Sequence, residues 1–181
     1  MKIEKTFING LLIITPKLFT DDRGSFYESY NLKVLNKIIN INFVQDNESI
    51  SKKGAIRGLH FQAPPFEQAK LVRCVSGKVL DVSVDLRANS KTFGKSFSVE
   101  ISSKNNKQVF IPKGFAHGFQ VLSDKAIVNY KVDKYYNPDS ESGIIWNDKD
   151  LLIKWNHDIE PILSKKDLEL KLFKNLESPF L

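Results

Sequence analysis

The sequence holds a single cysteine, Cys74, among its 181 residues. One thiol excludes an intramolecular disulfide framework and is typical of a protein that works in a reducing compartment. No apolar run approaches the ~18 residues of a membrane-spanning helix, and the N-terminal stretch MKIEKTFING lacks the apolar centre of a secretion signal. We therefore expect a cytoplasmic protein without a membrane segment, and its length predicts one domain over residues 1–181.

The sequence also lacks the common motifs for metal binding, nucleophilic catalysis and nucleotide binding. The only histidines, His60, His117 and His157, lie far apart in the sequence, without H-x-H, H-E-x-x-H or a cysteine cluster. No G-x-S-x-G elbow, P-loop or dinucleotide-binding glycine fingerprint occurs. The sequence predicts no metal and no organic cofactor, so its chemistry would run on side chains; a metal site assembled across strands is the alternative.

A deficit of negative charge leaves a net charge of +6. The lysines are dispersed among aspartates and glutamates, which is typical of a solvated surface rather than a nucleic-acid-binding face. No zinc-finger, RNA-binding or helix-turn-helix pattern is present. We expect no nucleic-acid partner, although the charge suits a small anionic ligand such as a phosphate ester.

The most frequent pattern in the sequence is the alternation of apolar and polar residues. In VLDVSVDLR, residues 79–87, apolar Leu80, Val82, Val84 and Leu86 alternate with polar side chains. Similar short strands are predicted over residues 97–102, 107–112, 117–123 and 126–132, with turn-forming residues between them. Many short strands without intervening helices predict an all-β antiparallel sandwich or barrel.

Helical patterns are confined to two peripheral segments. Residues 31–39 place four apolar side chains on one stripe, and residues 164–176 form an amphipathic pattern. Ser164 and Asp167 have capping-box spacing at the start of the second segment. We expect a short helix in the first segment and a C-terminal helix in the second.

The stretch GAIRGLHFQ, residues 54–62, combines an apolar strand with Arg57 and His60. Their odd separation would place these two side chains on opposite faces of a regular strand. Gly58 lies between them, and a glycine bulge shifts the register by one residue. We predict such an irregularity at Arg57–Gly58, with both side chains on one face.

Each polar residue of interest also has a purely structural explanation. A lone histidine in a strand is usually hydrogen-bonded in place, and Arg57 would pair with a surface carboxylate. Asp167 would accept from the Ser164 amide, and Tyr130 would fill the core beside Val128 and Val132. Only the combination of these residues favours a functional site.

Several blocks of the sequence, in this order, resemble the dTDP-4-dehydrorhamnose 3,5-epimerase family, and the similarity covers nearly the whole chain. The blocks are DDRGSFYES (21–29), FVQDNES (43–49), IRGLHFQ (56–62), AKLVRCVSGKVLDVSVDLR (69–87), TFGKS (92–96), FIPKGFAHGFQVLSD (110–124), YKVDKYYNPDSE (130–141) and LSKKD (163–167). The resemblance implies a cupin-like jelly roll, usually a homodimer, that needs no metal or organic cofactor.

The resemblance also implies a reaction and its catalytic residues. The family's substrate is a dTDP-linked 4-keto-6-deoxy sugar, whose ketone acidifies the protons on C3 and C5. His60 matches the base and Asp167 the carboxylate that orients it. Tyr130 matches the proton donor on the other side of the sugar ring. Lys70 matches a cation close to the C4 oxygen, where negative charge develops.

A second group of residues matches positions that hold the nucleotide sugar. Arg23 and Arg57 match arginines at the phosphates, with Lys166 beside them. Tyr136 matches an aromatic side chain that stacks on thymine, supported by Phe26 from the neighbouring subunit. The remaining matches to substrate-binding positions are Glu28, Gln45, Asp46, Asn47, His117 and Glu141.

The function predicted in this way is epimerisation of dTDP-4-dehydro-6-deoxy-D-glucose at C3 and C5, giving dTDP-4-dehydro-L-rhamnose for nucleotide-sugar biosynthesis. Two alternatives stay open at this point. The first is an epimerase that acts at one carbon or on another nucleotide-linked 4-keto sugar, GDP-linked sugars included. The second is a non-catalytic jelly roll that binds sugar nucleotides.

Overall fold

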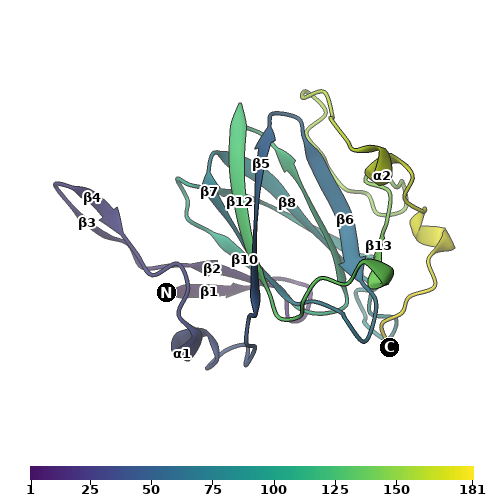
Figure 1. The fold of residues 1–181 in the computed structure, drawn as a ribbon, viewed down its shortest axis with the longest axis horizontal. Coiled ribbons are helices and arrows are strands. Elements are labelled where there is room, and N and C mark those ends of the chain that lie inside the picture. The colour runs from purple at the N-terminus through teal and green to yellow at the C-terminus, as the bar shows by residue number, and fades with distance from the viewer.

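Two antiparallel sheets dominate the computed structural model, which describes residues 1–181 (Figure 1). The six-stranded sheet has the order β1 (Lys2–Lys5), β2 (Leu12–Thr15), β10 (Gln108–Ile111), β7 (Lys70–Ser76), β12 (Lys125–Val132), β5 (Gln45–Lys52). The five-stranded sheet has the order β13 (Glu141–Gly143), β6 (Ile56–Gln62), β11 (Phe115–Val121), β8 (Lys78–Asp85), β9 (Ser96–Ser102). The predicted antiparallel sandwich is confirmed.

The main core lies between the two sheets. It contains 14 buried residues, among them Phe115 and Phe119 of β11 facing Val72 of β7 and Val128 of β12. Burial of side chains of this size stabilises the fold by about 1.5–3 kcal/mol each. This packing fixes the distance between the sheets and hence the position of polar side chains that point into the same space.

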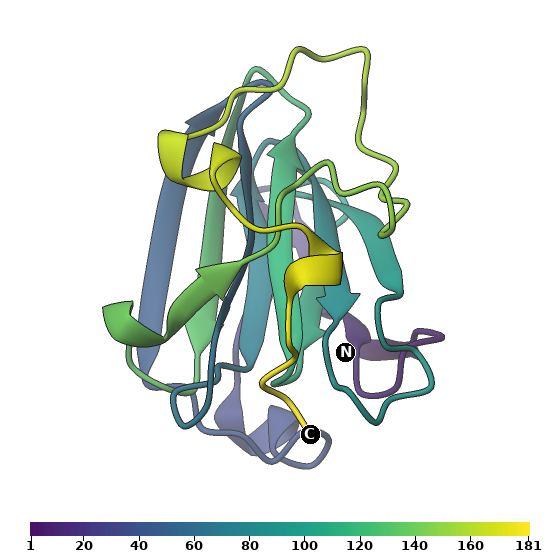
Figure 2. The ribbon, with the colours of Figure 1, turned by 90° about the vertical axis from the view of Figure 1, so that its right-hand side faces the viewer.

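The outer face of the five-stranded sheet is covered by the C-terminal part of the chain. Val82 and Val84 of β8 pack in one cluster with Leu151, Trp155 and Phe180. Figure 2 shows the yellow C-terminal segment crossing this face. The alternation predicted for β8 is therefore real, but both of its faces are buried, because its polar positions point into the space between the sheets.

The first predicted helix is shorter than expected. The helix α1 spans only Leu32–Leu35, with Asn31 Oδ1 accepting from the Val34 amide at 3.2 Å. Asn36 then ends it, because its side-chain oxygen accepts from the Ile41 amide at 3.2 Å and turns the chain back. The apolar stripe that predicted a helix to residue 39 continues in turns instead.

The predicted C-terminal helix over 164–176 is wrong beyond its first turn. The helix α2 spans Lys165–Leu168, and only a short 3-10 turn, η2 (Phe173–Asn175), follows. Between them the chain is extended, because the Lys171 carbonyl accepts from the Ile145 amide at 2.9 Å and the Phe173 amide donates to Asp148 at 2.7 Å. Neither α1 nor α2 has the length or the apolar character of a membrane-crossing helix.

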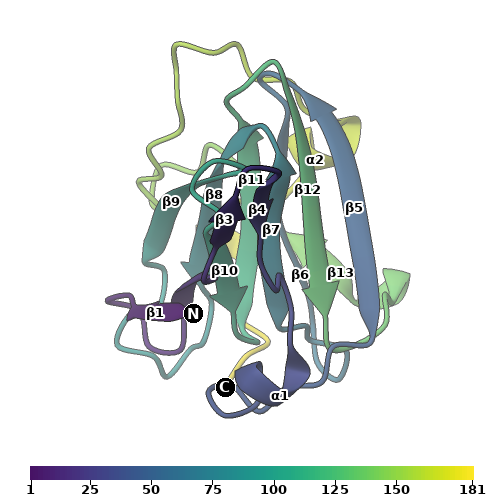
Figure 3. The same ribbon diagram turned by 90° about the vertical axis from the view of Figure 1, so that its left-hand side faces the viewer.

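A small hairpin stands apart from both sheets. Strands β3 (Phe19–Asp21) and β4 (Gly24–Phe26) pair only with each other, and their residues are exposed. Figures 1 and 3 show this hairpin projecting from the side of the six-stranded sheet. Its position separates several predicted substrate-binding residues from the body of the molecule.

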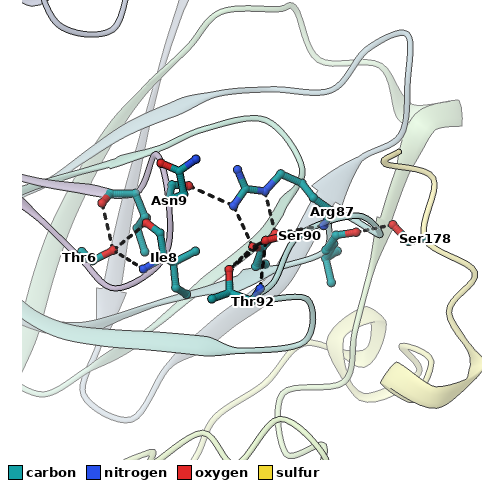
Figure 4. A network of polar contacts seen from close by, with 10 residues as sticks. Thr6, Ile8, Asn9, Arg87, Ser90, Thr92 and Ser178 are labelled. Carbon is teal, nitrogen blue, oxygen red and sulfur yellow. Dashed lines mark hydrogen bonds and ion pairs between the residues drawn. The ribbon is translucent and has the colours of Figure 1, made fainter.

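An ion pair between the buried Asp85 and the partly exposed Arg87 anchors the turn after β8, and Figure 4 shows Arg87, Ser90 and Thr92 of this turn. Asp85 accepts from the Arg87 guanidinium at 2.8 Å, from Ser90 at 2.6 Å and from Thr92 at 2.7 Å. Arg87 also donates to the Asn9 carbonyl at 3.0 Å, which ties this turn to the N-terminal region. Burial raises the pKa of Asp85, but these hydrogen bonds outweigh it, so the pKa lies below its usual range.

Candidate active site

A cavity of about 560 Å³ lies between the sheets, beside the edge strand β5 and strand β6. Its walls come from β5, β12 and β7 of one sheet, from β6 and β11 of the other, and from residues 162–167. A smaller hollow of about 120 Å³ shares the lining residues His60, Lys70 and Tyr130 with it. These three side chains therefore stand where the two spaces meet.

The register of β6 explains why Arg57 and His60 both reach this cavity. Opposite β11, His60 pairs with His117 and Arg57 pairs with Phe119, so three steps on β6 match two on β11. The extra residue lies at Gly58 and Leu59, and the predicted irregularity is confirmed. Arg57 and His60 both line the cavity.

Only glycine is compatible with this bulge. Gly58 has φ +119°, and a Cβ atom there would lie 2.5 Å from Gly118 Cα and 2.6 Å from the His117 carbonyl oxygen. The two backbones touch, and no side chain fits between them. Ile56 and Leu59 consequently pack in the outer cluster, while the polar side chains face inward.

His60 forms a pair with Asp167, a residue of α2. The Nε2 atom of His60 lies 2.5 Å from Asp167 Oδ1, and the Asp167 amide donates to Ser164 Oγ at 3.1 Å. Burial raises the pKa of Asp167, but the hydrogen bonds and charge of its neighbours outweigh it and hold the pKa below its usual range. The carboxylate therefore accepts a proton-bearing Nε2, which leaves Nδ1 as the free basic nitrogen of His60.

Lys70 and Tyr130 approach from the opposite sheet. Lys70 Nζ lies 6.0 Å from the centre of the Tyr130 ring, and Lys70 is only 9% exposed. Burial lowers the pKa of Lys70 to about 8, partly opposed by the charges of Asp81 and Glu141. Burial also raises the pKa of Tyr130. At neutral pH the site thus presents a cationic lysine and a neutral phenol.

A second histidine–carboxylate pair lies beside the first. His117 Nε2 lies 2.8 Å from Asp81 Oδ2, and both residues are buried. His117 was expected from the resemblance, whereas Asp81 was missed. Its signal in the sequence is an acidic residue on the inward face of an apolar strand, which period-2 alternation alone does not distinguish from a solvated position.

The polar residues predicted for the nucleotide fall into two groups. Arg57 and Lys166 line the larger cavity, and Arg57 donates to Ser51 at 3.0 Å. Gln45, Asn47, Tyr136 and Glu141 line the smaller hollow.

Glu141 links these two groups. It accepts from Tyr136 Oη at 2.6 Å and from Lys166 Nζ at 2.5 Å. Burial raises the pKa of Glu141, but these two hydrogen bonds outweigh it and the pKa is lowered. The carboxylate is thus ionised and connects β13 to α2 across the rim of the site.

Four predicted residues are not brought to the cavity. Arg23 pairs with Asp21 in the projecting hairpin, Phe26 is 69% exposed, and Glu28 accepts from Asn31. Asp46 points to the other face of β5, because it alternates with Gln45 and Asn47, and it pairs with Lys131 at 2.8 Å. Nothing in this single chain places these four side chains against a ligand in the cavity.

The donor atoms of the site do not form a metal-binding set. No three or more histidine, cysteine, aspartate or glutamate side chains are grouped so that they could hold a metal ion. The two pairs His60–Asp167 and His117–Asp81 instead satisfy each other by hydrogen bonds. What the arrangement offers chemically is a base, an acid and a buried cation around one space.

Comparison with known proteins decides the family. Residues 5–175 match the family model described as dTDP-4-dehydrorhamnose 3,5-epimerase. The chain belongs to this family. The dTDP-4-dehydrorhamnose 3,5-epimerase of Escherichia coli strain K12 is 50% identical over 172 residues, which cover 94% of this chain and 93% of that protein.

Solved structures of the epimerase family share the fold. An epimerase from Legionella pneumophila Philadelphia 1, in complex with dTDP-4-keto-L-rhamnose, superposes with a TM-score of 0.92 and 44% identity, covering 97% of this chain and 94% of that one. A 3'-monoepimerase from Streptomyces bikiniensis, in complex with dTDP-quinovose, gives a TM-score of 0.88 and 33% identity, covering 92% and 85%. The cupin-like jelly roll implied by the resemblance is thereby confirmed.

Proposed function

We propose that this protein epimerises dTDP-4-dehydro-6-deoxy-D-glucose at C3 and C5 to dTDP-4-dehydro-L-rhamnose, a step in dTDP-L-rhamnose biosynthesis. The observation that carries the proposal is the His60–Asp167 pair at 2.5 Å, in a cavity that Lys70 and Tyr130 also line. Family membership supports the substrate class, and the Legionella relative was solved with dTDP-4-keto-L-rhamnose.

The first step is removal of a proton next to the ketone. His60 Nδ1 takes the proton from C3 or C5, and the electron pair of the broken C–H bond forms an enolate whose negative charge lies on the C4 oxygen. Asp167 holds the Nε2 proton and stabilises the imidazolium as it forms. Lys70 is the cation available to the enolate oxygen, and a preorganised donor of this kind is worth roughly 3–4 kcal/mol in comparable sites.

The second step returns a proton to the other face of the same carbon. Tyr130 reaches the cavity from β12, across from His60 on β6, and both side chains line it. Its raised pKa keeps the phenol protonated, so it donates to the enolate carbon and the carbonyl re-forms. The phenolate and the imidazolium then exchange protons with solvent before the next carbon reacts. These transfers require no metal or organic cofactor.

The nucleotide would lie along the polar side of the site. We assign the phosphates to Arg57 and Lys166 and the thymine ring to Tyr136, which is 55% exposed. The proposal includes a homodimer in which the β3–β4 hairpin and the residues directly after it deliver Arg23, Phe26 and Glu28 to the neighbouring subunit. Support comes from the hairpin itself, which stands away from its own sheets (Figure 1). It also includes a cytoplasmic location, in keeping with the free thiol of Cys74.

A second candidate is epimerisation at C3 alone. The observation that favours it is the shared fold of the Streptomyces bikiniensis 3'-monoepimerase, at a TM-score of 0.88. Both reactions use one base and one acid, so the two candidates differ in which carbons the bound sugar presents to them.

Deuterium exchange distinguishes these functions. The protein is incubated with dTDP-4-dehydro-6-deoxyglucose in deuterium oxide, and NMR reads deuterium at C3 and C5. Deuterium at both carbons, with an L-configured product, supports the double epimerase, whereas deuterium at one carbon supports the second candidate. No deuterium at either carbon, with dTDP binding intact, contradicts both.

Two variants test the roles of the base and the acid. His60→Ala is expected to bind dTDP but to lose exchange at both carbons. Tyr130→Phe is expected to retain some exchange through His60 while losing inversion. Inversion at wild-type rate in Tyr130→Phe would assign the donor elsewhere.

A further inference from the structure

The two histidine–carboxylate pairs of the cavity are neighbours across two strands. His60 of β6 and His117 of β11 are directly paired in the register, and both line the cavity. The proposed mechanism uses only the pair of His60 and Asp167. Asp81, the partner of His117, is left without an assigned role although it is 1% exposed.

Asp81 has an unused acceptor. Its Oδ2 atom bonds His117, but its Oδ1 atom is buried and has no hydrogen-bond partner. An unsatisfied oxygen on a buried carboxylate destabilises the folded state. A neutral acceptor would hold the ring of His117 equally well, so a carboxylate with a buried unpaired oxygen at this place calls for a separate explanation.

The charge of Asp81 acts on Lys70. Lys70 forms no direct ion pair, and Asp81 and Glu141 are the carboxylates whose charges favour its protonated form. Asp81 lies on the five-stranded sheet and Lys70 on the six-stranded sheet. A carboxylate set back from the lysine favours its charge without occupying the donor hydrogens that the substrate oxygen needs.

We propose that Asp81 is a positioning residue of the epimerisation, which fixes the ring of His117 at the cavity wall and places a buried carboxylate behind the space that Lys70 enters. The inference rests on the proposed function for the substrate. With Nε2 bound to Asp81, His117 turns its other ring nitrogen away from the carboxylate, and the orientation of the ring is set. Lys70 then meets the developing enolate as a cation.

Other charged groups around the same space also influence the protonation of Lys70. The remaining titratable and charged side chains that line the two hollows with Lys70 are Lys52, Arg57, His60, His117, Tyr130, Tyr136, Glu141, Lys166 and Asp167. Glu141 is already hydrogen-bonded to Tyr136 and Lys166, and Asp167 to His60. Among the carboxylates around this space, Asp81 is therefore the one with a buried oxygen that has no hydrogen-bond partner.

The test compares Asp81→Asn with Ser83→Ala. Asparagine keeps a hydrogen-bond acceptor for His117 and removes the charge, whereas Ser83→Ala removes a buried hydroxyl without a partner from the same strand and leaves every charge in place. Thermal unfolding first establishes that each variant folds, and Asp81→Ser replaces Asp81→Asn if the latter does not. Asp81→Glu, which restores the charge, is the rescue variant.

The measurements are the pH profile of kcat and a direct titration of Lys70. The titration follows the 13Cε signal in lysine-labelled protein, assigned with Lys70→Met. In wild type both should report a transition near pH 8. In Asp81→Asn we expect the transition to move to lower pH by about one unit. The protonated fraction of Lys70, and kcat with it, should then fall about twofold at pH 7 and about fivefold at pH 8, and KM should change less. Asp81→Glu should return the transition toward its wild-type position.

The outcomes separate this inference from the proposed function. If wild type turns over the dTDP sugar and the Lys70 transition in Asp81→Asn stays where it is in Ser83→Ala, the positioning role is overturned. If wild type turns over no dTDP sugar but the Lys70 transition moves in Asp81→Asn, the proposed function fails while the electrostatic coupling of Asp81 to Lys70 stands.

Discussion

His60 and His117 face each other across β6 and β11, and each bonds a carboxylate through Nε2. They differ in access: the His60 side chain is 29% exposed and that of His117 only 7%. A base must reach the carbon it deprotonates, so the more open ring is the one suited to proton abstraction. The buried ring is suited to shaping the wall of the cavity.

The first prediction concerns the partner of His60. Asp167→Asn replaces the acceptor of the Nε2 proton and removes the charge that stabilises the imidazolium. We expect kcat to fall roughly 10²- to 10⁴-fold with the fold intact. Steady-state kinetics measure the loss, and calorimetry with dTDP should give an affinity close to that of wild type.

Ser164→Ala is the matched control for this variant. It removes the hydroxyl that accepts from the Asp167 amide but leaves the carboxylate itself in place. Loss of such a cap costs about 1 kcal/mol of stability, and the effect on kcat should be much smaller. Wild-type turnover in Asp167→Asn would remove Asp167 from the mechanism.

The second prediction concerns the bulge in β6. Gly58→Ala introduces a methyl group 2.5 Å from Gly118 Cα at φ +119°, whereas Gly24→Ala meets nothing within 4 Å at φ +126°. The positive φ alone costs about 1–3 kcal/mol in either variant. Gly58→Ala should lose clearly more, because strands β6 and β11 must separate.

Denaturant unfolding of the two glycine variants measures this difference. Equal free energies of unfolding in both would show that the contact between the backbones of Gly58 and Gly118 is not limiting. A larger loss in Gly58→Ala, accompanied by loss of turnover, would connect the bulge to the placement of His60.

The sequence allowed the sandwich and the bulge to be predicted because both depend on short-range rules. Alternation identifies the strands, and an odd spacing around a glycine identifies the irregularity between Arg57 and His60. The helix over 164–176 failed for the opposite reason. The spacing of its apolar residues fits a helix, but Ile145 and Asp148 form hydrogen bonds with its backbone after the first turn and hold it extended.

The site was predictable only in part. His60, Lys70, Tyr130 and Asp167 come from strands and a helix far apart in the sequence, and the family resemblance, not spacing, linked them. Asp81 was missed, because whether an acidic residue on an alternating strand faces solvent or the interior depends on how the two sheets pack.

The third prediction concerns acid stability. The folded pKa of Asp85 is lowered, so its contribution to stability is present above the unfolded pKa and is lost as the pH falls through the folded value. Asp85→Asn should therefore lower the free energy of unfolding at neutral pH, by about 3 kcal/mol or more since Arg87 loses its buried partner. This deficit should shrink in acid, while kcat stays unchanged because Asp85 does not line the cavity.

Thermal unfolding from neutral to acidic pH measures this prediction. Lys131→Met is a matched control, because its ammonium pairs with the exposed carboxylate of Asp46. Surface pairs of that kind are worth about 0–1 kcal/mol. A deficit in Asp85→Asn that is independent of pH would assign the effect to shape rather than to charge.

The fourth prediction is that Lys70 lowers the stability of the folded protein although its activity requires this residue. The folded pKa of Lys70 is about 8 and the ordinary value is 10.5, so the folded state penalises the charged form. Below about pH 8 Lys70 is charged in both states, so the folded state bears the full penalty. Between pH 8 and 10.5 Lys70 is neutral in the folded state but still charged in the unfolded state, and the penalty disappears as the pH rises through this range. A shift of this size corresponds to about 3 kcal/mol.

Lys70→Met should consequently raise the free energy of unfolding at neutral pH while abolishing most turnover. Its advantage over wild type should decrease between pH 8 and 10.5, where wild type no longer carries the buried charge. Denaturant unfolding across this range, beside kinetics at neutral pH, measures both effects. A variant less stable than wild type at neutral pH would show that Lys70 supports the fold, whereas a more stable and inactive variant would show that its buried charge is kept for the reaction.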